Sequence, residues 1–151
     1  MKKLITILLL TIWLFANEYN VGEKIEPINL KDQFDKDHNI SKLPTTIIIA
    51  FEKESSYIFN EYMKDKNNGF LANNNMLFLA DISQMPSFVT TNFALPKMRE
   101  YNYLVLLISN ENTAFKYPYR EDKLTIIKLD NDKIKSIDFV SDLKELENNL
   151  K

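Results

Sequence analysis

Three short runs of apolar residues along the chain predict buried strands. The first follows Leu43-Pro44 and spans residues 45–51, TTIIIAF; the others are residues 76–82, MLFLADI, and residues 103–109, YLVLLIS. The first run is β-branched and lacks the apolar–polar alternation of a half-buried strand. Such runs are typical of strands that are covered on both faces. We therefore predict that the three runs form the core of one sheet, with residues 45–51 as its central strand.

A helix is predicted between the first two runs. Ser55 or Ser56 can cap its start, and residues 66–69, KNNG, supply a stop. Between these points the apolar residues recur at helical spacing: Tyr57, Ile58, Tyr62 and Met63. Because a strand, a helix and a following parallel strand connect in the right-handed sense, residues 45–82 predict a βαβ unit.

The remaining segments predict a second helix, a loop and two hairpins. The helix begins at Pro86 and is kinked or restarted at Pro96. Residues 110–123 are polar with scattered aromatic residues and predict a loop. The first hairpin lies within residues 21–40, and the second within residues 124–140, around a polar turn. A final amphipathic helix follows, with Leu143, Leu146 and Leu150 on its apolar face.

The first sixteen residues have the pattern of a signal peptide. Lys2 and Lys3 precede an apolar stretch at 4–15, and Ala16 stands before a polar segment. The stretch is shorter than the roughly 20 residues that span a bilayer. We predict cleavage after Ala16 and a periplasmic location, with residues 17–151 forming a single domain. Leu14 stands where the cleavage pattern prefers a small residue, so an uncleaved N-terminal anchor, with the domain outside the cytoplasm, is the alternative.

Composition excludes several classes of function. The sequence has no cysteine, which excludes thiol–disulfide exchange and thiol peroxidase chemistry, and His38 is its only histidine, so metal sites built from histidine and cysteine are excluded. Without Lys2 and Lys3, 17 basic residues face 21 acidic residues, a net charge of −4 that disfavours nucleic acid as a partner. With two glycines in the whole sequence there is no phosphate-binding loop or dinucleotide fingerprint, and no cofactor is expected.

The order of the predicted elements resembles the thioredoxin-like superfamily, in its longer peroxiredoxin or TlpA-like form, over nearly all of residues 17–151. Residues 21–40, VGEKIEPINLKDQFDKDHNI, are similar to the entry hairpin of those proteins, TTIIIAF to their central strand, and residues 124–134, LTIIKLDNDKI, to their penultimate hairpin. The resemblance implies an α/β fold. Its mixed sheet would have a parallel βαβ core and an antiparallel C-terminal hairpin, with helices on both faces.

The chain departs from the superfamily at both parts of the redox site. The catalytic cysteine or Cys-x-x-Cys pair normally follows the central strand, where this chain has residues 52–57, EKESSY. The superfamily's cis-proline normally stands just before the penultimate strand, where this chain has residues 121–123, EDK, with Pro118 further upstream. The resemblance therefore implies a redox-inactive member that keeps the scaffold.

Ligand sites in open α/β sheets gather beyond the carboxyl ends of the parallel strands, so the position of the missing redox loop is the favoured site. Tyrosine is also enriched at protein contacts, and three tyrosines, Tyr57, Tyr117 and Tyr119, are expected near this position. Our leading hypothesis is a non-catalytic protein of the cell envelope that binds a protein or peptide through this face. It predicts an exposed aromatic surface near Tyr57, Tyr117 and Tyr119. The candidate face comprises Glu52, Glu54, Ser55, Ser56, Tyr57, Asp81, Tyr117, Pro118 and Tyr119.

Two other functions stay open from the sequence. A thiol-independent, hydrolase-like enzyme would use Glu52, Glu54 and Asp81, and it predicts a pocket in which at least two of these carboxylates converge. A Ser-His-Asp arrangement is disfavoured, because His38 falls in the polar turn of the entry hairpin, where we expect it to be exposed. The remaining possibility is a structural accessory protein with no small-molecule site.

Overall fold

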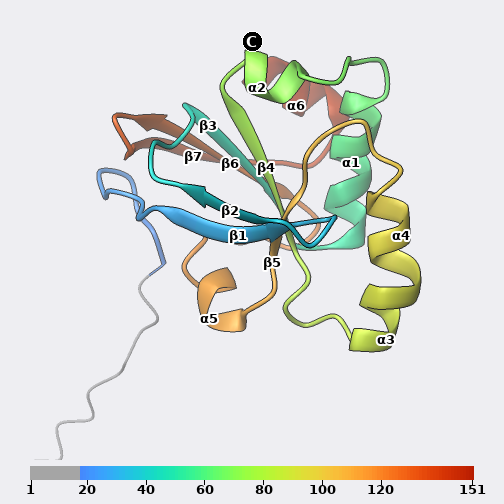
Figure 1. Ribbon diagram of the computed structural model, residues 1–151. Coiled ribbons are helices and arrows are strands. Elements are labelled where there is room, and N and C mark those ends of the chain that lie inside the picture. Colours follow the sequence, from blue (N-terminus) through green and yellow to red (C-terminus); the bar gives the residue numbers. More distant parts are fainter. Residues whose placement is uncertain (1–17) are drawn as a thin grey trace, which may run out of the picture.

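The computed structural model of the protein describes residues 18–151, and these form one mixed sheet of seven strands (Figure 1). The strand order is β2-β1-β5-β4-β3-β6-β7, parallel among β3, β4 and β5 and antiparallel elsewhere. The strands are β1 (Ile28–Asp32), β2 (Asp37–Ile40), β3 (Thr46–Ala50), β4 (Met76–Asp81), β5 (Leu106–Ile108), β6 (Leu124–Asp130) and β7 (Lys133–Val140). This confirms the predicted mixed sheet, with its parallel core and antiparallel C-terminal hairpin.

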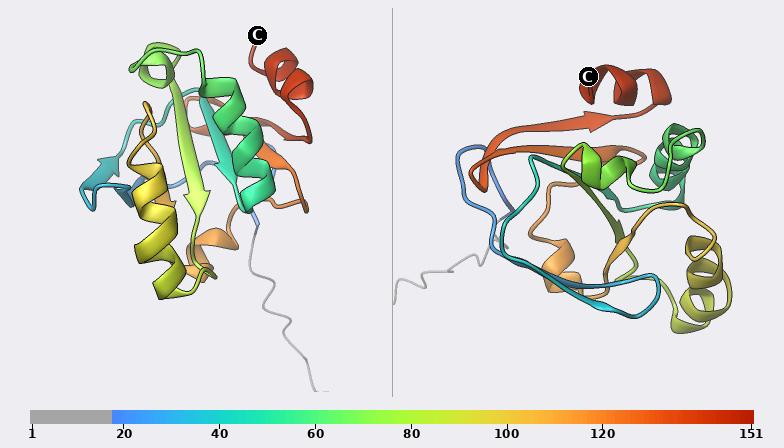
Figure 2. Two further views of the ribbon diagram at one scale, coloured as in Figure 1. Left: turned by 90° about the vertical axis from the view of Figure 1, so that its right-hand side faces the viewer. Right: turned by 45° about the horizontal axis from the view of Figure 1, so that its top comes forward.

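The helices lie on both faces of the sheet, and most of them lie on one face (Figure 2). Buried side chains of α1, α2 and α6 join the core on that face: Phe59, Met63, Leu71 and Leu146. The opposite face is covered by α5 and by the segment that precedes β1, which contribute Ala114 and Ile25. The helices are α1 (Lys53–Met63), α2 (Phe70–Asn73), α3 (Ser87–Val89), the π-helix η1 (Thr90–Ala94), α4 (Leu95–Met98), α5 (Glu111–Ala114) and α6 (Leu143–Asn149).

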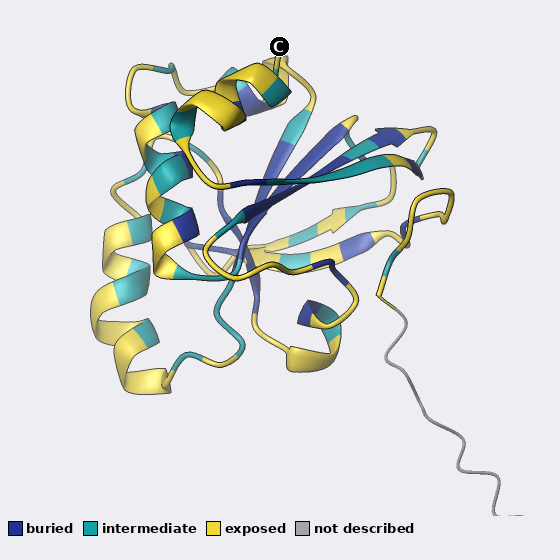
Figure 3. Ribbon diagram, turned by 180° about the vertical axis from the view of Figure 1, so that it is seen from behind, coloured by how far each residue is buried: buried dark blue, intermediate teal, exposed yellow. Residues whose placement is uncertain are grey.

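Strand β3 lies inside the sheet between β4 and β6, and both of its faces are covered; the middle of the strand order is β4, so the prediction that residues 45–51 form the central strand was wrong by one strand. Ile47, Ile48 and Ile49 are completely buried, and Figure 3 shows the central strands as the most buried part of the sheet. β3 pairs in parallel with β4 and antiparallel with β6. Burying each isoleucine side chain contributes about 2 kcal/mol of hydrophobic free energy. The carboxyl ends of β3 and β4 are therefore held side by side on a rigid base.

The helix after β3 begins at Lys53, earlier than the predicted start at Ser55 or Ser56. Ser55 lies inside the first turn, where its hydroxyl accepts a hydrogen bond from the amide of Glu52 at 3.3 Å and donates one to the carbonyl of Glu52 at 3.0 Å. The side chain of Ser55 is fully buried in this position. A serine in the predicted redox position is thus part of the helix start and faces away from solvent.

The segment predicted as a helix that begins at Pro86 and is kinked or restarted at Pro96 consists of α3, the π-helix η1 and α4, and Pro96 lies in the first turn of α4, as a restart predicts. Two other helical segments differ from the sequence prediction. The predicted loop at 110–123 contains α5, whose start is capped by the Asn110 side chain accepting the amides of Asn112 and Thr113. The short helix α2, next to the predicted stop at 66–69, was not predicted.

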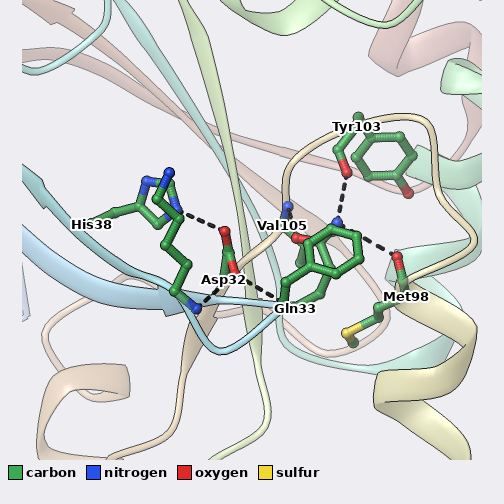
Figure 4. Close-up of polar contacts among 8 residues, drawn as sticks. Asp32, Gln33, His38, Met98, Tyr103 and Val105 are labelled. Atoms are coloured by element: carbon green, nitrogen blue, oxygen red, sulfur yellow. Dashed lines mark hydrogen bonds and ion pairs between the residues drawn. The ribbon is translucent and has the colours of Figure 1, made fainter.

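The turn between β1 and β2 is fixed by a buried pair of polar residues, Asp32 and Gln33 (Figure 4). Asp32 accepts hydrogen bonds from the amides of Phe34 and Lys36, and Nε2 of His38 lies 2.7 Å from its Oδ2. Burial alone would raise the pKa of Asp32, but the hydrogen bonds from His38 and the two amides outweigh it and leave the pKa lowered. His38 lies on β2 and is only partly exposed, so the expectation of an exposed turn was wrong.

Gln33 connects the β1–β2 turn to the segment that leads from α4 into β5. Its side-chain amide donates to the carbonyl of Tyr103 at 2.9 Å, and its Oε1 accepts the amide of Val105 at 2.9 Å. The Arg99 side chain donates to the backbone carbonyl of Gln33 at 2.8 Å. Figure 4 shows Gln33 beside Tyr103 and Val105, and it also shows the side-chain amide of Gln33 donating to the carbonyl of Met98 in α4, at 3.5 Å. These contacts hold α4 against the sheet although α4 has only four residues.

The predicted signal peptide, residues 1–16, lies outside the described residues, and so does the proposed cleavage after Ala16. Within residues 18–151 no helix combines the length and the apolar character needed to cross a bilayer.

Candidate functional site

The parallel pairing of β3 with β4 brings Glu52 and Asp81 to the same edge of the sheet. Ala50, the last residue of β3, is paired with Ala80, and the next residue of β4, Asp81, is the last of that strand. Glu52 and Asp81, together with Phe51, form part of the lining of two adjoining cavities. The three residues are thus a shared wall at the position where the sequence predicted a site.

The first cavity, which we call the Tyr119 pocket, has a volume of about 320 Å³. It combines four aromatic rings with three carboxylates. The rings belong to Phe51, Phe115, Tyr117 and Tyr119, and the carboxylates to Glu18, Glu52 and Asp81. Two of the rings are held against each other, since Phe51 and Tyr119 make an edge contact at 5.3 Å between ring centres. Within residues 18–151, no lysine or arginine lines this pocket.

Backbone and hydroxyl donors fix each carboxylate of the Tyr119 pocket. The Tyr119 hydroxyl donates to Oε1 of Glu52 at 2.5 Å, and the amide of Asp122 donates to its Oε2 at 2.6 Å. Glu18 accepts the amide of Tyr119 at 3.2 Å, and Asp81 accepts the amide of Ser83 at 2.9 Å. These bonds orient the negative groups toward a common space.

The electrostatic character of the pocket is reflected in the titration of Tyr119. The hydrogen bond to Glu52 raises the pKa of Tyr119 to about 12, with further contributions from burial and from the charges of Glu52, Glu121 and Asp122. All of these charges are negative, so they oppose formation of a phenolate. The acidic side chains around Tyr119 therefore favour its neutral phenol.

The second cavity, which we call the apolar groove, has a volume of about 330 Å³ and lies between α1 and the α3–η1–α4 segment, over β4. Its lining is mainly apolar and includes Tyr57, Met85, Val89, Phe93 and Met98. The left view of Figure 2 shows α1 and α4 flanking β4. The groove shares Phe51, Glu52 and Asp81 with the Tyr119 pocket.

Large apolar side chains at and beside the rim of the groove are exposed to solvent. Phe93 is 62% exposed and Tyr57 is 57% exposed, although both line the groove. Phe88, 69% exposed, contacts Phe93 at 5.8 Å between ring centres. Phe93 lies in the π-helix η1, and such local widenings of a helix are frequent at functional sites. Adjacent exposed aromatic residues of this kind mark interaction surfaces more often than isolated ones.

The structure brings together only part of the predicted face. Glu52, Asp81, Tyr117 and Tyr119 line the Tyr119 pocket, and Ser56 and Tyr57 line the apolar groove. Tyr117 is only 6% exposed, so it forms the base of its pocket, and burial raises its pKa.

Three predicted residues line neither cavity: Glu54, Ser55 and Pro118. Glu54 is exposed, whereas Ser55 and Pro118 are buried, and the Pro118 carbonyl accepts the Thr125 hydroxyl at 2.6 Å. The peptide bond before Pro118 is trans, as are the others of residues 18–151.

Several residues of the site were not predicted from the sequence. Glu18 precedes the first predicted element, and Phe115 belongs to the segment predicted as a loop. Met85 and Phe93 come from the connection between β4 and β5. Phe93 did carry a signal, because Phe88, Val89 and Phe93 place three large apolar side chains in one short segment.

Two of the three carboxylates named for the enzyme alternative, Glu52 and Asp81, line the same two cavities, as that alternative predicts, whereas Glu54 lines neither. Among residues 18–151, no three histidine or acidic side chains are grouped closely enough to hold a metal ion. The only histidine, His38, is bonded to Asp32 on β2.

The topology and the position of the site define the class of this protein: it has a thioredoxin-like fold, and it has no cysteine. No protein-family model matches the chain, and no curated protein matches it. Its likeness to solved structures confirms the fold implied by the sequence resemblance.

Three of these solved structures illustrate that likeness. A putative protein disulfide isomerase from Bacteroides thetaiotaomicron has a TM-score of 0.59 at 13% identity, over 87% of this chain and 86% of that one. A peroxiredoxin-like protein from Aquifex aeolicus has a TM-score of 0.54 at 13% identity, over 90% and 88%. A thio-disulfide isomerase from Thermus thermophilus has a TM-score of 0.53 at 15% identity, over 87% and 95%. At these identities the likeness concerns the fold alone.

Proposed function

We propose that this protein is a non-catalytic thioredoxin-fold binding protein of the cell envelope, which holds a protein or peptide segment in the apolar groove. The observation that carries the proposal is the set of exposed side chains at and beside the groove, Tyr57, Phe88 and Phe93, beyond the carboxyl end of β4. The leader pattern of residues 1–16 supports the envelope location. The absence of cysteine supports a binding role in place of thiol chemistry.

A segment of polypeptide is favoured over a small cofactor because of the shape and lining of this surface. The groove is lined by α1 on one side and by the α3–η1–α4 segment on the other, and the exposed ring of Phe88, outside the lining itself, contacts Phe93. Hydrophobic grooves between elements commonly receive apolar side chains of a partner segment. Burying one large aromatic or aliphatic anchor in such a groove contributes about 2 kcal/mol or more.

Photocross-linking in the native envelope tests this proposal. A photoreactive benzoylphenylalanine is placed at Tyr57, at Phe93 and, as a control, at Lys144 on α6, which is exposed and remote from the groove lining. We expect the same partner to be captured from Tyr57 and Phe93 and not from Lys144, with the yield at Tyr57 reduced several-fold in Phe88→Ser. Equal capture from all three positions, or capture from none, contradicts the proposal.

A further inference from the structure

We propose that the Tyr119 pocket is a subsite for an organic cation, namely the guanidinium or ammonium group of an arginine or lysine that lies beside an apolar residue in the bound segment. This inference rests on the proposed function and specifies the sequence of the ligand. It is carried by the combination of an aromatic cavity with three carboxylates and by the wall that this cavity shares with the apolar groove.

The negative charges of the pocket are not neutralised by neighbouring side chains. Among residues 18–151, the ion pairs within 4.0 Å do not include Glu18, Glu52 or Asp81. The basic side chains next to Glu52 and Tyr119 in the sequence do not line the pocket: Lys53 lies over the ring of Tyr57 in the groove lining, and Arg120 lies over the ring of Phe139 and donates to the carbonyl of Tyr119. Three carboxylates facing one cavity without a counter-charge favour a positively charged occupant.

The aromatic rings make an organic cation a better occupant than a metal ion. Cations are attracted to the faces of aromatic rings, and arginine and lysine are the groups that use this interaction in proteins. The carboxylates of Glu18, Glu52 and Asp81 surround the cavity without the close grouping that a metal ion requires. A planar guanidinium can donate hydrogen bonds from its edge to a carboxylate while an aromatic ring packs against its face.

The pocket has the size expected for one long basic side chain. Its volume, about 320 Å³, lies at the small end of the range for ligand sites. The base of the pocket is formed by Ala114 and Tyr117, which are buried, while Phe115 and Tyr119 remain exposed at its sides. The aliphatic part of a lysine or arginine can therefore contact rings while its charged end reaches the carboxylates.

The shared wall predicts the order of residues in the ligand. Phe51, Glu52 and Asp81 contribute to both cavities, so a side chain in the groove and a side chain in the pocket are neighbours across this wall. Side chains on residues that are adjacent, or separated by one residue, are close enough for such placement in an extended segment. The ligand is thus expected to carry a large apolar residue next to, or one residue from, a basic residue.

The first test uses two small probes that differ only in charge, Nα-acetyl-arginine amide and Nα-acetyl-citrulline amide. Citrulline has the shape of arginine without its positive charge. In NMR titrations of the protein we expect arginine to shift the amide signals of Glu52, Asp81 and Phe115, and citrulline to shift them at least tenfold less at equal concentration. Equal effects of the two probes, or no effect of arginine, would overturn the cation subsite.

The second test uses peptides that fill both cavities: acetyl-Ala-Leu-Arg-Ala-amide and acetyl-Ala-Leu-Ala-Arg-Ala-amide, with their citrulline counterparts. We expect one arginine peptide to bind at least tenfold more tightly than its counterpart. Phe115→Ala, an exposed position, and Asp81→Asn should each remove most of that preference. Glu61→Gln, on the exposed side of α1 and outside both linings, should preserve it. A preference that survives both Phe115→Ala and Asp81→Asn would contradict the assignment.

The two tests separate failure of the subsite from failure of the groove. If both the arginine and citrulline peptides bind equally, the groove binds polypeptide and the cation subsite is wrong. If the arginine amide shifts the pocket signals but no peptide binds more tightly than the amide, the subsite stands and the peptide groove is wrong. If neither the amide nor any peptide binds, the subsite is overturned, and the cross-linking result decides the proposed function separately.

Discussion

The hydroxyl of Tyr119 donates a hydrogen bond of 2.5 Å to Oε1 of Glu52, and the two residues are 67 positions apart in the sequence. This bond joins the segment before β6 to the residue that precedes α1. Phe51 supports it through its edge contact with the Tyr119 ring. The wall between the Tyr119 pocket and the apolar groove is therefore built from distant parts of the chain.

Substituting Glu52→Gln is expected to return the pKa of Tyr119 from about 12 toward its ordinary value of 10. The charged carboxylate favours the neutral phenol, because it accepts its proton in a hydrogen bond and repels the phenolate; a neutral amide does this more weakly. The change is measured by NMR of ¹³C-labelled tyrosine between pH 9 and 12. Glu61→Gln is the control and should leave the Tyr119 titration unchanged, and an unchanged titration in Glu52→Gln would contradict the assigned hydrogen bond.

Substituting Gln33→Leu is expected to lower the free energy of unfolding by about 2 kcal/mol. Leucine fills a similar volume but leaves the carbonyl of Tyr103 and the amide of Val105 without their side-chain partner, and unpaired buried polar groups carry a cost of this order. Urea denaturation measures the change. The control is Asn29→Leu, at an exposed position of β1, the strand that leads into the turn of Gln33, for which we expect a change within about 0.5 kcal/mol. Similar losses in both variants would argue against the role of Gln33.

The lowered pKa of Asp32 predicts a loss of stability in acid. Because its folded-state pKa lies below 3.8, the stabilising contribution of its carboxylate is fully present above about pH 4 and is lost as the pH falls through the folded-state pKa. In Asp32→Asn this contribution is missing at neutral pH. The free energy of unfolding of the variant should therefore depend less on pH below 4 than that of the unmodified protein. Urea denaturation of both proteins between pH 2.5 and 7 measures the difference, and parallel pH profiles would exclude the assignment.

Truncation to alanine should have a large effect on stability at one phenylalanine, Phe59, and a small effect at another, Phe93. Phe59 is completely buried and stacks on Phe78 at 4.0 Å between ring centres, so Phe59→Ala should cost about 3–5 kcal/mol. Phe93 is exposed, so Phe93→Ala should change stability by no more than about 0.5 kcal/mol while weakening ligand binding. Thermal and urea unfolding measure the stability change in both variants. A large stability loss in Phe93→Ala would mean that Phe93 supports the fold and is not part of a free surface.

The elements predicted most accurately from the sequence are those with strong local patterns. The run TTIIIAF became β3 within one residue at each end, because a β-branched segment of that length has no competing helical periodicity. The two short helices α2 and α5 were missed since each has only four residues and depends on contacts outside its own sequence. For α5 the Asn110 cap was a usable signal, whereas nothing local distinguishes α2 from a turn.

The candidate site could be placed from the sequence but not assembled. The rule that sites gather beyond parallel strands correctly located Glu52 and Asp81 at one edge. The rule says nothing of which loop crosses that edge, so it could not distinguish buried Tyr117 from exposed Tyr119, nor bring Glu18 to the pocket. These placements follow from tertiary packing of the segment between β5 and β6.

The buried hydroxyl of Ser55 has a consequence for how a partner of the proposed kind would be released. In thiol–disulfide exchange a partner is captured through a mixed disulfide, and its release waits for a second chemical step. Ser55 is enclosed in the first turn of α1, and this sequence has no cysteine. A complex at this edge would therefore form without a mixed disulfide to this chain, and its release would need no thiol exchange.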